Sequence, residues 1–120
     1  MPYVLVVDDD PDIRRLLEEV LTDEGYETRL ASNGAEALTA VAEREPDLIL
    51  LDLMMPVMDG RQFCERFLRS RDAGGRRAPV LVISADRALP EQARRMGVDG
   101  YIAKPFDIDH PLDVVARRLG

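Results

Sequence analysis

The alternation of short apolar runs with helix-period segments is the feature that most constrains this fold. The apolar, β-prone runs predict strands over Tyr3–Val7, Tyr26–Ala31, Leu48–Leu51, Val80–Ile83 and Gly100–Ala103. After each run, apolar residues recur at helical spacing, as Ile13, Leu17 and Leu21 do after the first. Strictly alternating strands and helices indicate an α/β fold, in which a parallel sheet is covered by helices on both faces.

The expected helices begin and end at local signals. Asp10 and Pro11 are typical of an N-cap and a first helical residue, and Gly25 can end that helix. The remaining helices are expected after Ser32–Gly34 as far as Glu45–Asp47, over about Gly60–Arg71, from near Pro90 to Gly97, and over Pro111–Leu119. The run Tyr26–Ala31 is less hydrophobic than the others, so we expect it at an edge of the sheet.

Length, charge and cysteine content restrict the class of protein. The 120 residues, 46% of them hydrophobic, suit one domain over residues 1–120 with its own core. The net charge of −7 argues against direct contact with nucleic acid or an anionic membrane. No apolar run approaches the roughly 20 residues that span a bilayer, and no signal-peptide pattern is present. Cys64 is the only cysteine, which excludes an internal disulfide and favours a cytoplasmic location.

Candidate site residues follow four of the five predicted strands, and the second strand contributes only Ser32 and Asn33. The candidates are Asp8, Asp9 and Asp10 after the first strand, Asp52 after the third, Ser84 after the fourth and Lys104 after the fifth. Ligands of open parallel sheets bind beyond the carboxyl ends of the strands, so this C-terminal edge of the sheet is the candidate site. If the first and third strands are neighbours, three carboxylates lie close together and a cation should neutralise them. All-oxygen ligands suit Mg²⁺ better than zinc.

Each of these residues also has a purely structural interpretation. Asp10 is expected to be a helix cap only, and Asp8 or Asp9 taken singly could equally be caps. Asp52 is harder to explain in that way, because several residues separate it from the next helix. Lys104 is the only lysine among 16 basic residues and the only cation we expect at this edge. The peptide bond to Pro105 could be cis or trans.

Four strings extend these observations to a family. They are Val6–Asp10, Leu51–Gly60, Ser84–Ala85 and Tyr101–Phe106. In order and spacing they resemble the receiver domain of bacterial two-component response regulators, over essentially the whole chain. The resemblance implies a flavodoxin-like, three-layer (βα)5 sandwich whose five-stranded parallel sheet has the order 2-1-3-4-5.

The resemblance also implies a function for the acidic residues. Asp52 would accept a phosphoryl group from a sensor histidine kinase or a phosphotransfer protein. Mg²⁺ would be bound by the carboxylates of Asp9 and Asp52, by the backbone carbonyl of Met54, and by Asp8 through water. Such a domain assists only its own phosphorylation and dephosphorylation, so we do not expect an enzyme acting on other substrates.

Three further residues receive roles from the resemblance. Lys104 would pair with one phosphoryl oxygen and Ser84 would donate a hydrogen bond to another. Tyr101 would be the switch aromatic, which turns inward when Ser84 moves. The surface of the fourth helix, fifth strand and fifth helix could contact a second copy or an output domain.

The chain departs from the commonest family pattern at two places. Met54 lies two residues beyond Asp52, where a polar residue is frequent, so the lifetime of the phosphoryl group stays open. The segment between Ser84 and Gly97 is short, and we expect a short fourth helix.

Two alternatives remain at this stage. The Asp-x-Asp within Asp8–Asp10 also occurs in haloacid-dehalogenase-type phosphohydrolases, but that hypothesis leaves Asp52–Gly60 unexplained. The other alternative is a receiver-like binding module that is never phosphorylated. An assay for phosphoryl label on Asp52, with a small-molecule phosphodonor, would distinguish the receiver hypothesis from these two alternatives.

Overall fold

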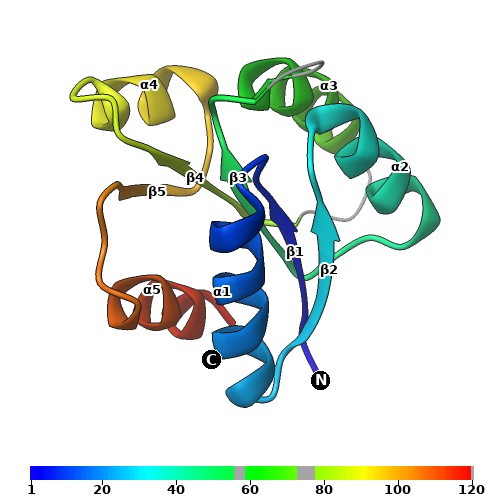
Figure 1. Ribbon diagram of the computed structural model, residues 1–120. Helices are drawn as coiled ribbons and strands as arrows, with labels where there is room; N and C mark the ends of the chain where they lie inside the picture. Colours follow the sequence, from blue (N-terminus) through cyan, green and yellow to red (C-terminus); the bar gives the residue numbers. More distant parts are fainter. Residues whose placement is uncertain (56–58, 73–77, 120) are drawn as a thin grey trace.

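Five strands and five helices alternate in the computed structural model, which describes residues 1–55, 59–72 and 78–119 (Figure 1). In chain order they are β1 (Tyr3–Val7), α1 (Pro11–Asp23), β2 (Glu27–Ala31), α2 (Gly34–Glu43), β3 (Leu48–Asp52), α3 (Gly60–Asp72), β4 (Val80–Ser84), α4 (Leu89–Met96), β5 (Gly100–Ala103) and α5 (Asp109–Leu119). Asp10 caps α1 by accepting a hydrogen bond from the Asp12 N–H, as its sequence position predicts. The alternating α/β pattern is confirmed.

All strands are parallel, and the sheet has the order β2-β1-β3-β4-β5. The order implied by the family resemblance is therefore confirmed, and β2 lies at an edge as its composition predicts. In the register of the central strands, Val7 pairs with Leu51 and Asp52 pairs with Ile83. The carboxyl ends of β1, β3 and β4 consequently lie side by side.

Two apolar layers cover the two faces of the sheet, because successive strand residues point to opposite faces. One layer joins Leu5, Val7, Ile49 and Leu51 to α2, α3 and α4, and includes the fully buried Phe63. The other joins Val4, Val6, Leu48, Leu50 and Ile83 to α1 and α5. Figure 1 shows the resulting three layers, with α1 and α5 on one side of the sheet. Strands buried on both faces explain the continuous apolar runs of the sequence.

Several boundaries differ from those expected. β3 and β4 each run one residue further, so Asp52 and Ser84 are the last residues of their strands rather than the first residues after them. β2 begins at Glu27, because the Tyr26 N–H still donates to Leu21 O at the end of α1. α5 begins two residues before Pro111, since first-turn N–H groups need no helical partner. α4, with 8 residues, is short, as predicted.

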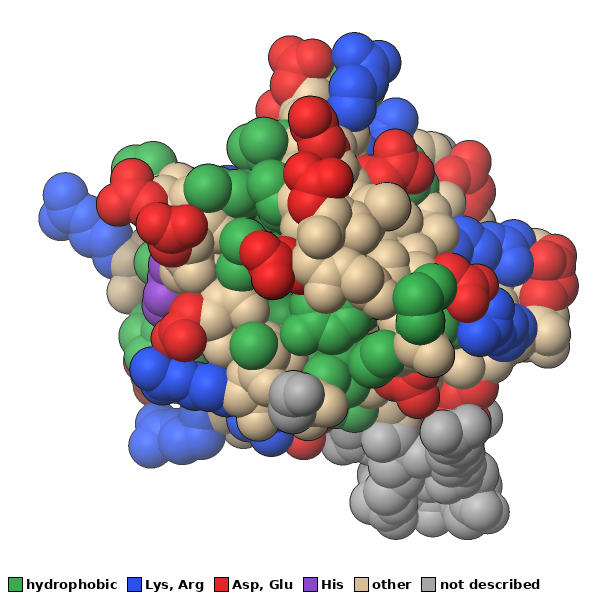
Figure 2. Space-filling model, turned by 90° about the horizontal axis from the view of Figure 1, so that it is seen from below, with side chains coloured by type: hydrophobic (Ala, Val, Ile, Leu, Met, Phe, Trp, Pro, Cys, Tyr) green, Lys and Arg blue, Asp and Glu red, His purple; other side chains and the backbone are tan. Residues whose placement is uncertain are grey.

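The end of the sheet at which the strands begin has a different character. Viewed from that end, apolar side chains gather near the middle of the face, and acidic and basic side chains surround them (Figure 2).

Among the described residues, no helix combines the length and the apolar character that crossing a membrane requires.

Candidate functional site

Asp8 and Asp52 lie next to each other because β1 and β3 are neighbours in register. Val7 and Leu51 are paired across the two strands, and Asp8 directly follows Val7 as Asp52 directly follows Leu51. Both aspartates therefore point to the face covered by α1 and α5. Their side chains are buried, with 1% and 3% of the residue exposed, whereas Asp9 is exposed. One carboxylate oxygen from each of Asp8, Asp9 and Asp52 lies within 4.8 Å of the others. The acidic cluster expected from the sequence is present.

The two carboxylate oxygens of Asp8 have different surroundings. Oδ1 accepts a hydrogen bond from the Asp10 N–H at 2.9 Å. Oδ2 is buried and has no hydrogen-bond partner among the described residues. The Lys104 Nζ lies 3.6 Å from it. A buried carboxylate oxygen without a hydrogen bond is unfavourable, and binding of a cation there would relieve it.

The Asp52 carboxyl has a strongly shifted pKa. Burial, followed by the nearby Asp8 carboxylate, raises the pKa of Asp52 from 3.8 to about 7. The Lys104 ammonium and a hydrogen bond of 3.3 Å from the Met54 N–H oppose the rise. Negative charge is therefore disfavoured at Asp52 until a further cation arrives.

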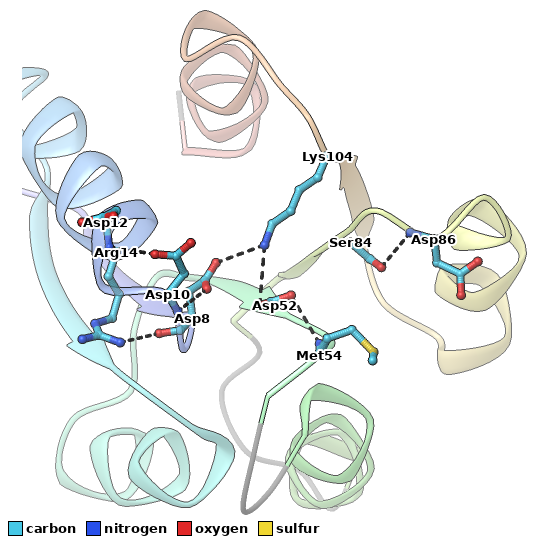
Figure 3. Close-up of polar contacts among 9 residues, drawn as sticks. All are labelled: Asp8, Asp10, Asp12, Arg14, Asp52, Met54, Ser84, Asp86 and Lys104. Atoms are coloured by element: carbon cyan, nitrogen blue, oxygen red, sulfur yellow. Dashed lines mark hydrogen bonds and ion pairs between the residues drawn. The ribbon is translucent and has the colours of Figure 1, made fainter.

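Lys104 reaches the acidic cluster from the end of β5 (Figure 3). Its Nζ lies 3.6 Å from Asp8 Oδ2 and 3.6 Å from Asp52 Oδ2, and 22% of its side chain is exposed. The Lys104 N–H donates to Ser84 O at 2.9 Å, which ties the chain after β5 to the end of β4. The Lys104–Pro105 peptide bond is cis, which is one of the two states that the sequence allows.

Ser84 lies on the other side of Asp52 from Asp8 (Figure 3), since β3 separates β1 from β4. Its Oγ accepts a hydrogen bond from the Asp86 N–H at 3.1 Å, so the hydroxyl proton remains available for donation. Tyr101, on β5, has an outward side chain that is 46% exposed.

The segment after Asp52 passes close to the site. Met54 is 73% exposed, whereas Met55 belongs to the core. The motif residues 56–58 lie outside the described ranges. A Cβ added to Gly60 would lie 2.6 Å from Asp52 O and 2.8 Å from Leu53 Cα. Glycine is therefore required where α3 begins against the backbone of the site.

Arg14 is a second cation at this edge, and it is not among the predicted site residues. Its Nη1 donates to the backbone carbonyl of Asp8 at 2.7 Å (Figure 3). The prediction that Lys104 is the only cation here is wrong, because a guanidinium one turn into α1 can reach back to the loop. The available signal was the position of Arg14, four residues after the N-cap Asp10.

Comparison with known protein families shows which family has this arrangement of site residues. The family model described as "Response regulator receiver domain" matches residues 4–116. The chain belongs to the response regulator receiver family. The dehalogenase-type hypothesis fits neither this match nor the relatives below.

The relatives of this receiver include regulators of different lengths. It is 43% identical over 116 residues to "DNA-binding response regulator MtrA" of Mycolicibacterium smegmatis, covering 95% of this chain and 47% of that protein. It is 40% identical over 118 residues to "Sporulation initiation phosphotransferase F" of Bacillus subtilis, covering 97% of this chain and 92% of that protein. The receiver thus spans about half the length of MtrA and nearly all of the second relative.

Solved receivers have the same fold. Chemotaxis response regulator CheY4 of Vibrio cholerae superposes with a TM-score of 0.86 at 31% identity, covering 98% of each chain. Response regulator protein TrrA of Thermotoga maritima, solved in complex with Mg(2+)-BeF, gives a TM-score of 0.86 at 32% identity, covering 98% of this chain and 99% of that one. The flavodoxin-like sheet order is therefore shared with this family.

The donor set of this receiver fits a hard divalent cation. It offers carboxylate oxygens from three residues, one of them buried without a hydrogen bond, and no sulfur or imidazole within the cluster. Mg²⁺ prefers such oxygen ligands and usually keeps several waters. Asp9, being exposed, leaves the cluster accessible from solvent.

Proposed function

We propose that Asp52 accepts a phosphoryl group from a phosphohistidine on a sensor histidine kinase or a phosphotransfer protein. The observation that carries this proposal is the Asp52 carboxylate at the C-terminal edge of the sheet, with Asp8 beside it and the Lys104 ammonium 3.6 Å away. The site residues at this edge come from separate strands, as a phosphoacceptor site of the family requires.

The chemistry needs an ionised Asp52. One of its carboxylate oxygens attacks phosphorus, an O–P bond forms, the P–N bond of phosphohistidine breaks, and the imidazole leaves. Lys104 favours the ionised nucleophile and then pairs with a phosphoryl oxygen. Ser84, whose hydroxyl proton is not used by the Asp86 contact, donates to a second phosphoryl oxygen.

Mg²⁺ is the cofactor we assign to the acidic cluster. Asp9 and Asp52 would hold it through their carboxylates and Met54 through its backbone carbonyl, with Asp8 acting through water. When bound, the ion supplies positive charge to the transferring phosphoryl oxygens. The Mg(2+)-BeF complex of TrrA supports this assignment, since that chain is 32% identical to this one.

The signal would leave the site through Ser84 and Tyr101. When Ser84 turns toward the phosphoryl group, its contact with the Asp86 N–H is lost, and Tyr101 turns inward. Both changes alter the face formed by α4, β5 and α5. We propose this face as the contact for a second copy or an output domain, in a cytoplasmic setting without direct nucleic-acid contact by this domain.

Labelling with a small phosphodonor and Mg²⁺ tests the proposal. We expect stoichiometric, alkali-labile label on the wild type and none on Asp52→Asn. Asp12→Asn is the matched control, because Asp12 is an exposed carboxylate in the first turn of α1. Steady release of phosphate would instead indicate a phosphohydrolase. No label on the folded wild type would indicate the unphosphorylated binding module.

A further inference from the structure

Arg14 contacts the acidic loop through its backbone rather than through a carboxylate. Its Nη1 donates to Asp8 O at 2.7 Å, and this carbonyl belongs to the peptide unit that joins Asp8 to Asp9. We propose that Arg14 is a positioning residue for the metal site: it fixes that peptide unit and thereby aims the two carboxylates. The inference rests on the proposed function, since it concerns the same Mg²⁺ cluster.

Asp8 is held at three points, and Arg14 supplies one of them. The Asp8 N–H donates to Ala31 O at 3.1 Å, which continues the β1–β2 pairing. Asp8 Oδ1 accepts a hydrogen bond from the Asp10 N–H at 2.9 Å, which joins the Asp8 side chain to the N-cap residue of α1. Among the residues that the structure describes, the Arg14 bond is the one hydrogen bond to the Asp8 carbonyl, so it limits rotation of the peptide that carries Asp9. Asp9 itself is exposed, and packing does little to hold it.

The backbone of Arg14 is held within helix α1. Its N–H donates to Asp10 O at 3.0 Å, within the first turn of α1. Its side chain is half-buried, and its charge also acts on Glu36 at the start of α2. Hydrogen bonds from the Ser32 N–H and hydroxyl lower the pKa of Glu36, and the Arg14 charge adds to the effect. The Arg14 charge therefore acts toward both the acidic loop and the start of α2.

Two effects of Arg14 on Mg²⁺ binding have opposite signs. Its positive charge near the cluster repels a divalent cation, so a residue that acted only as a counter-charge would weaken binding. Its bond to the carbonyl orders the ligands before the ion arrives, so a positioning residue strengthens binding. Loss of Arg14 should therefore tighten binding in the first case and weaken it in the second.

The experiment compares Arg14→Met, Arg14→Lys and Arg15→Met by calorimetric titration with Mg²⁺. Arg15 is the neighbouring, exposed residue of α1, so Arg15→Met removes the same charge without the carbonyl contact. We expect Kd to rise about tenfold in Arg14→Met, the loss of one charge-assisted hydrogen bond. Arg14→Lys, which keeps one donor and the charge, should restore most of the affinity. Arg15→Met should stay within about twofold of wild type.

A second measurement separates positioning from folding. Thermal melts in EDTA should give similar midpoints for the wild type and Arg14→Met, while labelling by a small phosphodonor slows in Arg14→Met at subsaturating Mg²⁺. Unchanged or tighter Mg²⁺ binding in Arg14→Met overturns the inference, and so does loss of the folded state in EDTA. A wild type that binds no Mg²⁺ and takes no label refutes the proposed function instead.

Discussion

At the residue scale, the site is dominated by the competition between burial and charge at Asp52. Burial and the Asp8 carboxylate raise its pKa to about 7, while Lys104, 3.6 Å away, acts in the opposite direction. The folded protein therefore binds a proton at Asp52 that the unfolded chain has released at the ordinary pKa of 3.8. This linkage gives a sign for the pH dependence of stability.

In EDTA, the contribution of Asp52 to stability should decrease as pH rises from about 4 to about 7 and stay lost above that range. Asp52→Asn has no such titration, so its midpoint of thermal unfolding should exceed that of wild type by an amount that grows with pH. Melts at about pH 5 and about pH 8 test this. A difference between the two proteins that stays constant with pH would contradict the raised pKa.

Lys104→Arg should slow labelling by a small phosphodonor at least about tenfold, although it preserves the charge. A planar guanidinium fork cannot occupy the point at which one ammonium lies between two carboxylates. Arg117→Lys, an exposed residue of α5, is the reciprocal control and should label normally. Wild-type labelling in Lys104→Arg would mean that only the charge matters.

At the element scale, strand ends could be predicted only to within a residue. The Asp52 and Ser84 side chains are polar, which suggested loops, but their backbones continue the ladder through bonds such as Leu53 N–H to Ile83 O at 3.1 Å. Backbone pairing does not depend on side-chain polarity, so the sequence could not reveal where these two strands end.

The contact of Arg14 could not be predicted for a related reason: helical spacing identifies its face of α1, but not the carbonyl within its reach.

Gly60 joins α3 to the site, and Gly60→Ala should disturb both. A Cβ there would lie 2.6 Å from Asp52 O, and neither that oxygen nor Leu53 Cα can move without shifting β3 or the following loop. We expect a loss of about 1–3 kcal/mol in the free energy of unfolding and slower labelling. Denaturant unfolding and labelling of Gly60→Ala beside exposed Arg61→Ala measure this. Equal stability of the two would show that the loop adjusts freely.

At the scale of the whole molecule, the acidic cluster opposes folding in the absence of metal. One carboxylate oxygen from each of Asp8, Asp9 and Asp52 lies within 4.8 Å of the others, and the Lys104 ammonium compensates this repulsion only in part. Most substitutions destabilise a protein, but removal of one of these carboxylates should do the reverse.

Asp9→Ala should therefore melt at a higher temperature than wild type in EDTA and should lose the stabilisation by Mg²⁺. In wild type, a metal concentration one hundred times its Kd should add about 2.7 kcal/mol by mass action. Paired melts with and without Mg²⁺ on the two proteins provide the test. If wild type ignores Mg²⁺ and Asp9→Ala melts lower in EDTA, Asp9 serves as a structural residue of the loop.

The sequence predicted the molecule well at the level of its architecture. Apolar runs placed all five strands, since the central ones are buried on both faces. The sheet order followed from the family resemblance, because periodicity alone cannot say which strands are neighbours. The acidic cluster was predicted from strand ends plus that order. What the sequence could not supply was the uneven burial of the cluster, in which Asp8 is enclosed and Asp9 is not.

The sheet order also affects how the chain folds during its synthesis. β1 is an interior strand of the sheet, yet its partner β3 lies about 45 residues further along the chain. At about 5–20 residues per second, a ribosome would expose the apolar strand β1 for roughly 2–9 seconds before β3 is made. β2 can pair with one side of β1 meanwhile, but the other side stays open to chaperones and to neighbouring nascent chains.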